Sequence, residues 1–288
     1  MMNETLKRLV SGAIYVIILV FFIQYSTKDN FASFFILFGL FLLIAVYEFC
    51  DLIKINKIFP LLFAATIYFL HFQVANASEK EILFYELRFN KNVDLMLLFL
   101  TLFVSIKSIV FLFDKGASSI SVLSKYIYLL GYIILPFVLI TKIPFGSVGY
   151  NPKIMISIFL LIWTNDTFAY IVGKSIGKRK LFETVSPKKT IEGFLGGIVF
   201  AIIVSYFISK YYIEIKDSNI YIWIVTATIV GVFGTIGDLI ESKFKRIAEK
   251  KDSGKIMPGH GGILDRLDSV IFVAPIIYLF YQILQYVS

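Results

Sequence analysis

Long runs of apolar residues alternate with short polar connections along this chain. Runs of roughly twenty apolar residues, long enough to cross the hydrocarbon core of a bilayer as a helix, recur nine times in the 288 residues. They predict transmembrane helices near residues 9–26, 31–50, 58–75, 93–113, 122–141, 153–172, 191–212, 220–240 and 269–287. Several connections contain proline or glycine, which favour turns. The pattern therefore predicts an all-α integral membrane protein, a polytopic bundle of about nine transmembrane helices.

The connections between the runs are too short to form a soluble domain. We therefore expect a single membrane domain over residues 1–288. Within it, residues 1–150 are expected to form scaffold spans, and residues 151–288 to carry the polar motifs in which chemistry takes place.

Composition supports the membrane class. Hydrophobic residues make up 58% of the chain and the mean hydropathy is +0.81, whereas soluble domains contain roughly 45–50% apolar residues. The first run follows Lys7 and Arg8, as in a signal peptide, but residues 24–26 offer no small-x-small cleavage site. We therefore expect an uncleaved first span. Cys50 is the only cysteine, which excludes an intrachain disulfide.

Positive charge distinguishes the two sides of the membrane. With a cytoplasmic N-terminus, nineteen of the 28 Lys and Arg residues fall on inner segments, six of them between residues 173 and 190 and seven between 241 and 268. Cytoplasmic loops carry such an excess of cations. We therefore expect a multi-pass protein of the inner (cytoplasmic) membrane of the cell, with its N-terminus and its polar clusters on the cytoplasmic side.

The first polar cluster reads N-D-T-F-A-Y at residues 165–170, near the inner end of the sixth span. A carboxylate inside a span is costly unless it is paired or hydrated, so Asp166 needs a partner or a function. Asn165 and Asp166 are therefore candidate binding residues. The alternative is a local hydrogen bond between Asp166 and Tyr170, which share a helix face at i,i+4.

The second cluster reads S-P-K-K-T-I-E-G at residues 186–193. Serine followed by proline predicts an N-cap at Ser186, which would place Lys188 and Lys189 in the first helical turn. The helix macrodipole disfavours cations there. A bound triphosphate would resolve the conflict, because it would use both ammonium groups and the hydroxyls of Ser186 and Thr190. The alternative is that both lysines reach lipid headgroups. Three glycines lie at the end of this cluster or just after it: Gly193, Gly196 and Gly197. Small residues at this spacing predict close packing against another helix.

The third cluster spans the end of the eighth run and the loop before the ninth. On a helix entering the ninth span, Asp265 and Asp268 lie at i,i+3 and face one way, so they could meet Asp238 at the end of the preceding span. Three converging carboxylates repel one another without a cation. Hard oxygen ligands suit Mg²⁺, one ion or two, which also binds phosphates. The alternative is a plain ion pair of Arg266 with Asp265 or Asp268.

Glycines surround His260 in the same loop. Gly259, Gly261 and Gly262 let backbone N–H groups approach an anion as a nest. The imidazole could be an acid, a ligand or a turn residue, and the sequence leaves these alternatives open.

The residues of these clusters resemble a known family. The pattern S-x-F-K-R-x4-K-D-x-G-x3-P-G-H-G-G-I-x-D-R-L-D at residues 242–268 resembles the signature of the phosphatidate cytidylyltransferase (CDP-diacylglycerol synthase) family. The clusters at 165–170 and 186–193 are similar to two upstream motifs of that family, in the same order. Met257 stands where the family usually has Leu, Ile or Phe. The first five spans agree with the family only in being apolar.

The resemblance implies transfer of a cytidylyl group from CTP to phosphatidic acid in the lipid bilayer, giving CDP-diacylglycerol and pyrophosphate. It implies Mg²⁺ as cofactor, held by Asp238, Asp265 and Asp268, and a homodimer whose contacts lie in residues 1–150. No nucleic acid is expected as a partner. The implied catalytic residues are Asp238, Lys245, Arg246, Asp265, Arg266 and Asp268. The implied substrate-binding residues are Asn165, Asp166, Ser186, Lys188, Lys189, Thr190, Glu192, Ser242, Lys251, Asp252, His260, Gly261 and Gly262.

Within this set, we expect Lys188 and Lys189 to hold CTP phosphates, and Lys245 and Arg246 to bind the lipid phosphate or the nucleotide. Asp166 would either be an additional metal ligand or support the metal ligands without contacting the ion. Two other functions stay open: a CTP-dependent kinase of polyprenols or phytol, and a cation-coupled membrane transporter that uses Asp166 and Asp238 as intramembrane sites.

Overall fold

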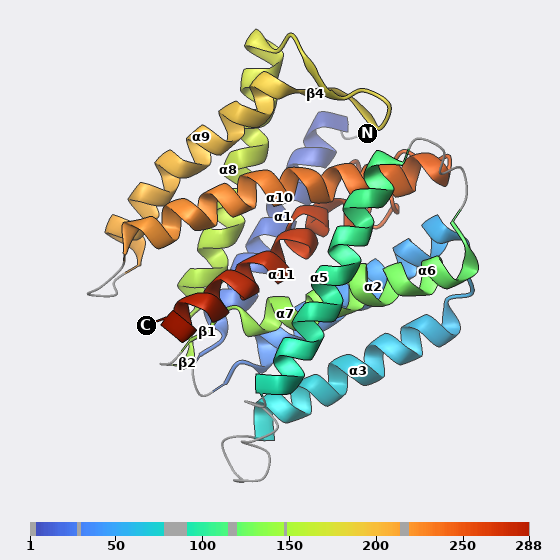
Figure 1. Ribbon diagram of the computed structural model, residues 1–288, viewed down its shortest axis with the longest axis vertical. Helices are drawn as coiled ribbons and strands as arrows, with labels where there is room; N and C mark the ends of the chain where they lie inside the picture. Colours follow the sequence, from blue (N-terminus) through green and yellow to red (C-terminus); the bar gives the residue numbers. More distant parts are fainter. Residues whose placement is uncertain are drawn as a thin grey trace.

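The computed structural model describes residues 4–27, 30–77, 91–114, 120–146, 149–213 and 219–287, and these residues fold almost entirely into helices (Figure 1). In this part of the chain, nine helical segments are long and apolar enough to cross a membrane: Leu6–Tyr25, Ala32–Ile53, Ile58–Asn76, Asn92–Phe113, Val122–Lys142, Pro152–Ile176, Ile191–Tyr212, Ile220–Ile247 and Leu264–Leu284. They correspond one to one to the predicted spans, so the predicted all-α membrane fold is confirmed.

The first five spans are built from the following elements: α1 (Glu4–Tyr25), α2 (Ala32–Ile53), α3 (Ile58–Ala77), α5 (Lys91–Phe113), α6 (Val122–Tyr128), the π-helical segment η1 (Leu129–Ile134) and α7 (Leu135–Lys142). The fifth span is therefore one continuous rod with a π-helical middle. Pro136 follows this segment and has no N–H to donate to the preceding turn, which is a common reason for a wider turn in a helix.

The remaining elements are β1 (Phe145–Gly146), β2 (Gly149–Tyr150), α8 (Pro152–Ile176), β3 (Lys180–Phe182), β4 (Ser186–Thr190), α9 (Ile191–Phe207), the π-helical segment η2 (Ile208–Tyr212), α10 (Ile220–Ile247) and α11 (Leu264–Val287). The four strands form two small antiparallel pairs, β1 with β2 and β3 with β4. The strands connect spans and build no sheet core.

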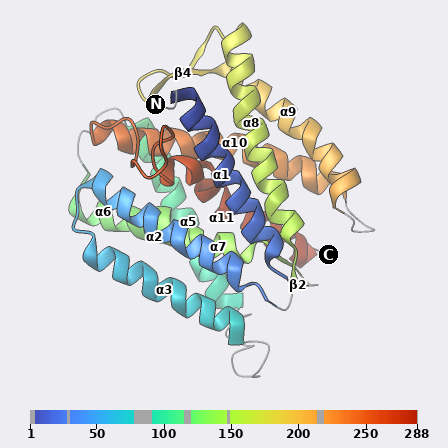
Figure 2. The same cartoon turned by 180° about the vertical axis from the view of Figure 1, so that it is seen from behind.

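Helix α11 occupies the centre of the bundle, where it packs against α10, α7, α5 and α2 (Figure 1). Helices α8 and α9 lie side by side and α10 packs against both, while α1 lies against α2 and α8 on the other face (Figure 2). Large apolar side chains are exposed on outer helices, among them Ile17 and Phe21 on α1 and Phe99 and Phe103 on α5. Such a surface suits contact with lipid tails.

The close contact of α8 with α9 depends on small residues. A Cβ added at Gly193 would lie 2.5 Å from the carbonyl oxygen of Ala169, and one added at Gly197 would lie 2.7 Å from that of Asn165. A Cβ at Gly196 would meet Val172 at 2.7 Å. The predicted use of these glycines in close helix packing is therefore confirmed.

The eighth and ninth spans extend beyond their predicted ends. Helix α10 continues to Ile247 rather than ending near residue 240, and α11 begins at Leu264 rather than near 269. The added residues include Glu, Lys, Arg and Leu, which are strong helix formers. Hydropathy missed them because they carry charged side chains, of which Glu241, Lys243, Lys245 and Asp268 are buried in the protein. Glu241, Lys245 and Arg246, which hydropathy left outside the eighth span, therefore lie on α10, and Asp265 and Asp268 lie on a helix entering the ninth span, as expected.

The prediction of a helix start at Ser186 was wrong. Residues Ser186–Thr190 form strand β4, and the N-cap of α9 is Thr190, whose hydroxyl accepts a hydrogen bond from Gly193 N at 3.1 Å. This start leaves both lysines outside the first turn and places Glu192 inside it. A carboxylate there is favourable to the macrodipole and a lysine is not, so the fold removes the predicted conflict without an added anion.

Candidate active site

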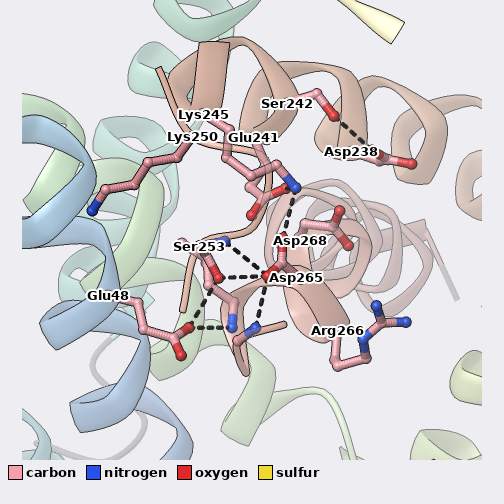
Figure 3. A network of polar contacts seen from close by, with 12 residues as sticks. Glu48, Asp238, Glu241, Ser242, Lys245, Lys250, Ser253, Asp265, Arg266 and Asp268 are labelled. Atoms are coloured by element: carbon pink, nitrogen blue, oxygen red, sulfur yellow. Dashed lines mark hydrogen bonds and ion pairs between the residues drawn. The ribbon is translucent and has the colours of Figure 1, made fainter. Parts of the chain in front are cut away.

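Three acidic side chains converge where α10 and α11 meet. Asp238 and Glu241 lie at i,i+3 on α10, and Asp268 lies near the start of α11 (Figure 3). One carboxylate oxygen from each lies within 4.8 Å of the other two, and this trio is the possible metal-binding group found among the described residues. Glu241 is fully buried and Asp268 is 8% exposed. Both helices therefore project carboxylates into one polar centre.

Two lysines flank this acidic cluster, which we define as Asp238, Glu241 and Asp268. Lys245 Nζ forms ion pairs with Glu241 Oε2 and, at 2.6 Å, with Asp265 Oδ1. Lys189 Nζ lies 2.5 Å from Asp238 Oδ2. With Asp265 counted, two cations face four carboxylates. Glu241 Oε1 is buried and has no hydrogen-bond partner among the described residues. An excess of negative charge and an unpartnered buried oxygen both suit a cation with hard oxygen ligands.

The acidic cluster differs from the predicted set of metal ligands, because Asp265 lies outside it. Its Oδ1 pairs with Lys245, and its Oδ2 accepts three hydrogen bonds: from Ser253 N at 2.9 Å, Ser253 Oγ at 2.9 Å and Gly262 N at 2.8 Å. A carboxylate with both oxygens so occupied has little capacity left for a metal ion. Glu241 takes the place that the sequence suggested for Asp265.

The upstream clusters approach the same centre from α8 and β4. Lys189 reaches Asp238 directly, and Asp166 is within electrostatic reach of both. Asp166 Oδ1 accepts a hydrogen bond from Asn165 Nδ2 at 3.3 Å. The alternative partner, Tyr170, is 68% exposed and its ring lies near Lys174. The exposed carboxylate of Asp166 is therefore hydrogen-bonded to its neighbour Asn165, not to Tyr170, and it interacts with the polar centre electrostatically.

Two other predicted site residues, Glu192 and Arg246, make hydrogen bonds that connect parts of the fold. Glu192 accepts from the backbone N–H groups of Lys178 at 3.0 Å and Arg179 at 3.1 Å, which joins the β3–β4 hairpin to α9. Arg246 donates from Nε to Val185 O at 3.3 Å and from Nη1 to Lys250 O at 3.2 Å. These two residues hold the hairpin and the end of α10.

The remaining predicted residues differ in their surroundings. Ser242 donates to Asp238 Oδ1 at 3.1 Å and so belongs to the centre. Arg266 is exposed and donates from Nη2 to the carbonyl oxygen of His260 at 2.9 Å, not to an aspartate. Three further predicted residues are also exposed: Lys188, Lys251 and Asp252. Ser186 is half-buried at the start of β4.

The glycine-rich turn at residues 258–262 makes its hydrogen bonds with other residues of the same chain. Gly259 and Gly261 have left-handed backbone angles, with φ of 77° and 87°, which glycine adopts without strain. Of the N–H groups in the predicted nest, that of Gly262 donates to an anion, and this anion is the carboxylate of Asp265. His260 is fixed from α1, because Ser11 Oγ lies 2.8 Å from His260 Nδ1 and 2.9 Å from Pro258 O.

Sequence reasoning missed Glu48, a buried residue near the end of α2. Its Oε1 accepts from Ile263 N at 3.2 Å, and its Oε2 accepts from Leu264 N at 2.8 Å and Ser253 Oγ at 3.1 Å (Figure 3). The signal was a single carboxylate within an apolar run, which marks a functional position by default. Its partners, more than two hundred residues away, could not be read from periodicity.

Comparison with known proteins adds the family. A sequence model of the cytidylyltransferase family matches residues 6–284. The phosphatidate cytidylyltransferase of Staphylococcus haemolyticus (strain JCSC1435) is 48% identical over 119 residues, which are 41% of this chain and 45% of that protein. The one of Bacillus subtilis (strain 168) is 50% identical over 119 residues, 41% of this chain and 44% of that protein. These alignments cover less than half of each relative's length. Because the family model matches nearly the whole chain, the chain belongs to the cytidylyltransferase family.

Proposed function

We propose that the protein transfers a cytidylyl group from CTP to phosphatidic acid, giving CDP-diacylglycerol and pyrophosphate for phospholipid synthesis. The observation that carries the proposal is the acidic cluster with its unpartnered Glu241 Oε1, flanked by Lys189 and Lys245 at one end of a membrane bundle. Membership of the cytidylyltransferase family and relatives named phosphatidate cytidylyltransferase support the same reaction.

The reaction requires two polyanions to meet. An oxygen of the lipid phosphate attacks the α-phosphorus of CTP, a new P–O bond forms, and the bond to the β-phosphate breaks as pyrophosphate leaves with the electron pair. A phosphate monoester has a second pKa of about 6, so at neutral pH it is largely a dianion and needs no general base. Catalysis then consists of positioning the substrates and stabilising charge.

We propose that Mg²⁺ binds at Asp238, Glu241 and Asp268. The three carboxylates fit the ion, because they supply hard oxygen ligands and Glu241 Oε1 has no protein partner among the described residues. When bound, Mg²⁺ supplies positive charge that neutralises phosphate oxygens on the two substrates.

The two lysines have different parts in the proposal. Burial works against the charge of Lys189, but its ion pair with Asp238 outweighs burial and holds the pKa of Lys189 above its ordinary value. Lys189 therefore stays cationic and, with the exposed Lys188, is available to hold nucleotide phosphates. Lys245 already has two carboxylate partners within the protein, so we assign it to orienting Glu241 and Asp265.

We propose that the acidic cluster lies on the cytoplasmic side of the inner membrane. Ser11, near the start of α1, contacts Pro258 and His260, so the N-terminal end of α1 and the glycine-rich turn lie together. The cation-rich segments at 173–190 and 241–268 lie together, because Arg246 donates to Val185 O. The homodimer implied by the family resemblance is part of the proposal, and the mass of the purified protein in lipid nanodiscs would test it.

The decisive experiment labels CTP at two positions. Purified protein is incubated with Mg²⁺, phosphatidic acid or a polyprenol, and CTP carrying ³²P at either the α- or the γ-phosphate. We expect α-label, and no γ-label, in a product formed from phosphatidic acid. Transfer of γ-label to a lipid would indicate a kinase, and ion-dependent solute uptake by vesicles without CTP consumption would indicate a transporter.

A matched pair of variants links the activity to the acidic cluster. Glu241→Gln should abolish most transfer, whereas Asp51→Asn should leave it unchanged, because Asp51 lies on α2 and pairs with Lys57 at 2.6 Å, away from the cluster. Normal turnover by Glu241→Gln would remove Glu241 from the site.

A further inference from the structure

We propose that Glu48 of α2 is a positioning residue of the active site, an inference that rests on the proposed function. It acts through Ser253 and the first residues of α11, which it holds so that Asp268 faces the acidic cluster. Glu48 is 1% exposed. It lies in the second span, far along the chain from the motifs that suggested the function.

The carboxylate of Glu48 is matched to its donors. Three hydrogen bonds reach its two oxygens: two from backbone N–H groups at the start of α11, Ile263 N and Leu264 N, and one from the Ser253 hydroxyl. The free N–H groups at a helix N-terminus, together with the macrodipole, favour a negative charge at this place. A glutamine would have one acceptor oxygen for three donors, and its NH₂ group would face a donor.

The loop is shaped around this side chain. A Cβ added at Gly254 would lie 2.2 Å from Glu48 Oε1. The next two atoms nearest to this Cβ, at 2.7 and 3.0 Å, also belong to Glu48. A Cβ added at Gly262 would lie 2.3 Å from Glu48 Oε2. Both glycines therefore permit the backbone to close on the carboxylate, and the glycine of the H-G-G motif at 262 has a specific packing partner on α2.

A continuous chain of contacts leads from Glu48 to the acidic cluster (Figure 3). Ser253 Oγ lies 3.1 Å from Glu48 Oε2 and 2.9 Å from Asp265 Oδ2, so the single proton of this hydroxyl is shared between the two carboxylates. Asp265 then pairs with Lys245, which pairs with Glu241. A second route runs along the backbone, from Leu264 N to Asp268 one turn later. Loss of Glu48 would loosen both routes at once.

The first test compares Glu48→Gln with Asp51→Asn, which removes a carboxylate from the same helix without touching the loop. For Glu48→Gln we expect kcat for cytidylyl transfer to fall by about tenfold or more, the effect of leaving charged-group hydrogen bonds unmade. The KM for CTP should change by less than about twofold, because no nucleotide-binding group is removed. Asp51→Asn should match the unaltered protein.

A second readout needs no turnover. Amide hydrogen exchange at Ile263 and Leu264 should be faster in Glu48→Gln than in the unaltered protein and in Asp51→Asn, because two N–H groups lose their acceptors. If the unaltered protein fails to transfer the cytidylyl group, the proposed function fails, but the exchange result still decides the role of Glu48. Unchanged exchange together with unchanged kcat in Glu48→Gln would overturn the inference.

A third comparison distinguishes the direct contact between Glu48 and Gly254 from a general folding defect. Gly254→Ala should impair turnover, because the three atoms nearest to its methyl group would all belong to Glu48. In the double variant Glu48→Ala/Gly254→Ala, the methyl group has room, so the combined loss should be smaller than the product of the separate losses. Independent, multiplicative losses would show that the two residues are not coupled and would overturn the inference, even where Glu48→Gln folds poorly.

Discussion

Asp265 and Asp268 lie one helical turn apart on α11, yet their surroundings are opposite. Asp265 receives hydrogen bonds or an ion pair at both oxygens, all from the loop and Lys245. Asp268 is buried opposite the carboxylates of Asp238 and Glu241, and its Oδ1 accepts a hydrogen bond from Ser269 N at 2.6 Å. The first residue is part of the framework and the second is suited to bind a cation.

Substitution should separate these two roles. Asp268→Asn should weaken Mn²⁺ binding, measured by electron paramagnetic resonance as a substitute for Mg²⁺, by at least about tenfold while leaving the melting temperature nearly unchanged. Asp265→Asn should destabilise the protein by about 3 kcal/mol, because Lys245 loses a buried partner, and its thermal midpoint should drop. The reverse pattern would contradict the assignment.

His260 is held by its neighbours in the neutral state. Burial, followed by the positive charges of Arg266 and Arg8, lowers the pKa of His260. Ser11 Oγ has one proton and two carbonyl acceptors within reach, Arg8 O and Pro258 O, so it is best satisfied by accepting a hydrogen bond from His260 Nδ1–H.

The lowered pKa predicts a pH dependence of stability. In the unfolded chain a histidine titrates near about 6.5, so on acidification the unfolded state binds the proton before the folded state does. Stability from this residue is therefore present above that pH and is lost as pH falls below it. The drop in thermal midpoint between pH 7.5 and 5.5 should be smaller in His260→Asn, which retains a donor toward Ser11 but cannot titrate. An equal drop in both proteins would contradict this prediction.

Some of these residues could be predicted from sequence and others could not. Asp238 and Asp268 were recognisable because each adjoins an apolar run that must be a helix. Glu241 was passed over because hydropathy placed the end of that helix at residue 240, and its shared face with Asp238 depends on the helix continuing. Glu48 was visible as an acid in an apolar run, but its contacts depend on tertiary structure alone.

At the scale of elements, the last turns of α10 determine the geometry of the candidate site. One face carries Glu241 and Lys245 into the centre, while Lys243 points to α5. Its ammonium group, on a side chain that is 7% exposed, binds the carbonyl oxygens of Phe111, Leu112 at 3.3 Å and Asp114 at 2.5 Å. These carbonyls end α5, where a cation is favourable.

Removal of this cap should destabilise the bundle without removing a site residue. Lys243→Met keeps the aliphatic length but removes the ammonium donor that three carbonyl groups share, so we expect a loss of about 2 kcal/mol. The exposed Lys178→Met is the matched control and should change stability little. Thermal unfolding in detergent measures both, and an unchanged midpoint in Lys243→Met would show that the contact contributes nothing.

The elements also show where pattern reading stops working. Length and hydropathy identify all nine spans because the bilayer imposes both. Pattern reading fails at β4, where the Ser-Pro pair resembles a helix start. The N-cap is instead Thr190, whose hydroxyl accepts a hydrogen bond from Gly193 N. Both positions obey local capping rules, and tertiary contacts of the hairpin with α9 decide between them.

At the scale of the molecule, the two halves of the chain meet in the loop before α11. Ser11 on α1 holds the turn at His260, and Glu48 on α2 holds the beginning of α11. The first two spans therefore contribute directly to the geometry of the candidate site, in addition to covering the bundle.

The proposed orientation predicts which ends of the spans can be labelled from outside. Cys50 is fully buried and is the only cysteine, so Cys50→Ala provides a background without reactive thiols. In that background, Lys251→Cys should react with a membrane-impermeant maleimide only after the membrane is opened, whereas Tyr221→Cys at the opposite end of α10 should react in intact cells. Labelling of Lys251→Cys in intact cells would reverse the orientation.

The acidic cluster is carried by two helices that belong to the membrane bundle itself, not by a domain standing above it. If phosphatidic acid is the acceptor, it can reach the carboxylates by diffusing sideways, with its acyl chains still in the leaflet. Encounter is then a two-dimensional process. The quantity that controls it is the mole fraction of acceptor in the membrane plane, so added neutral lipid would slow the reaction even though the amount of acceptor per millilitre stayed the same.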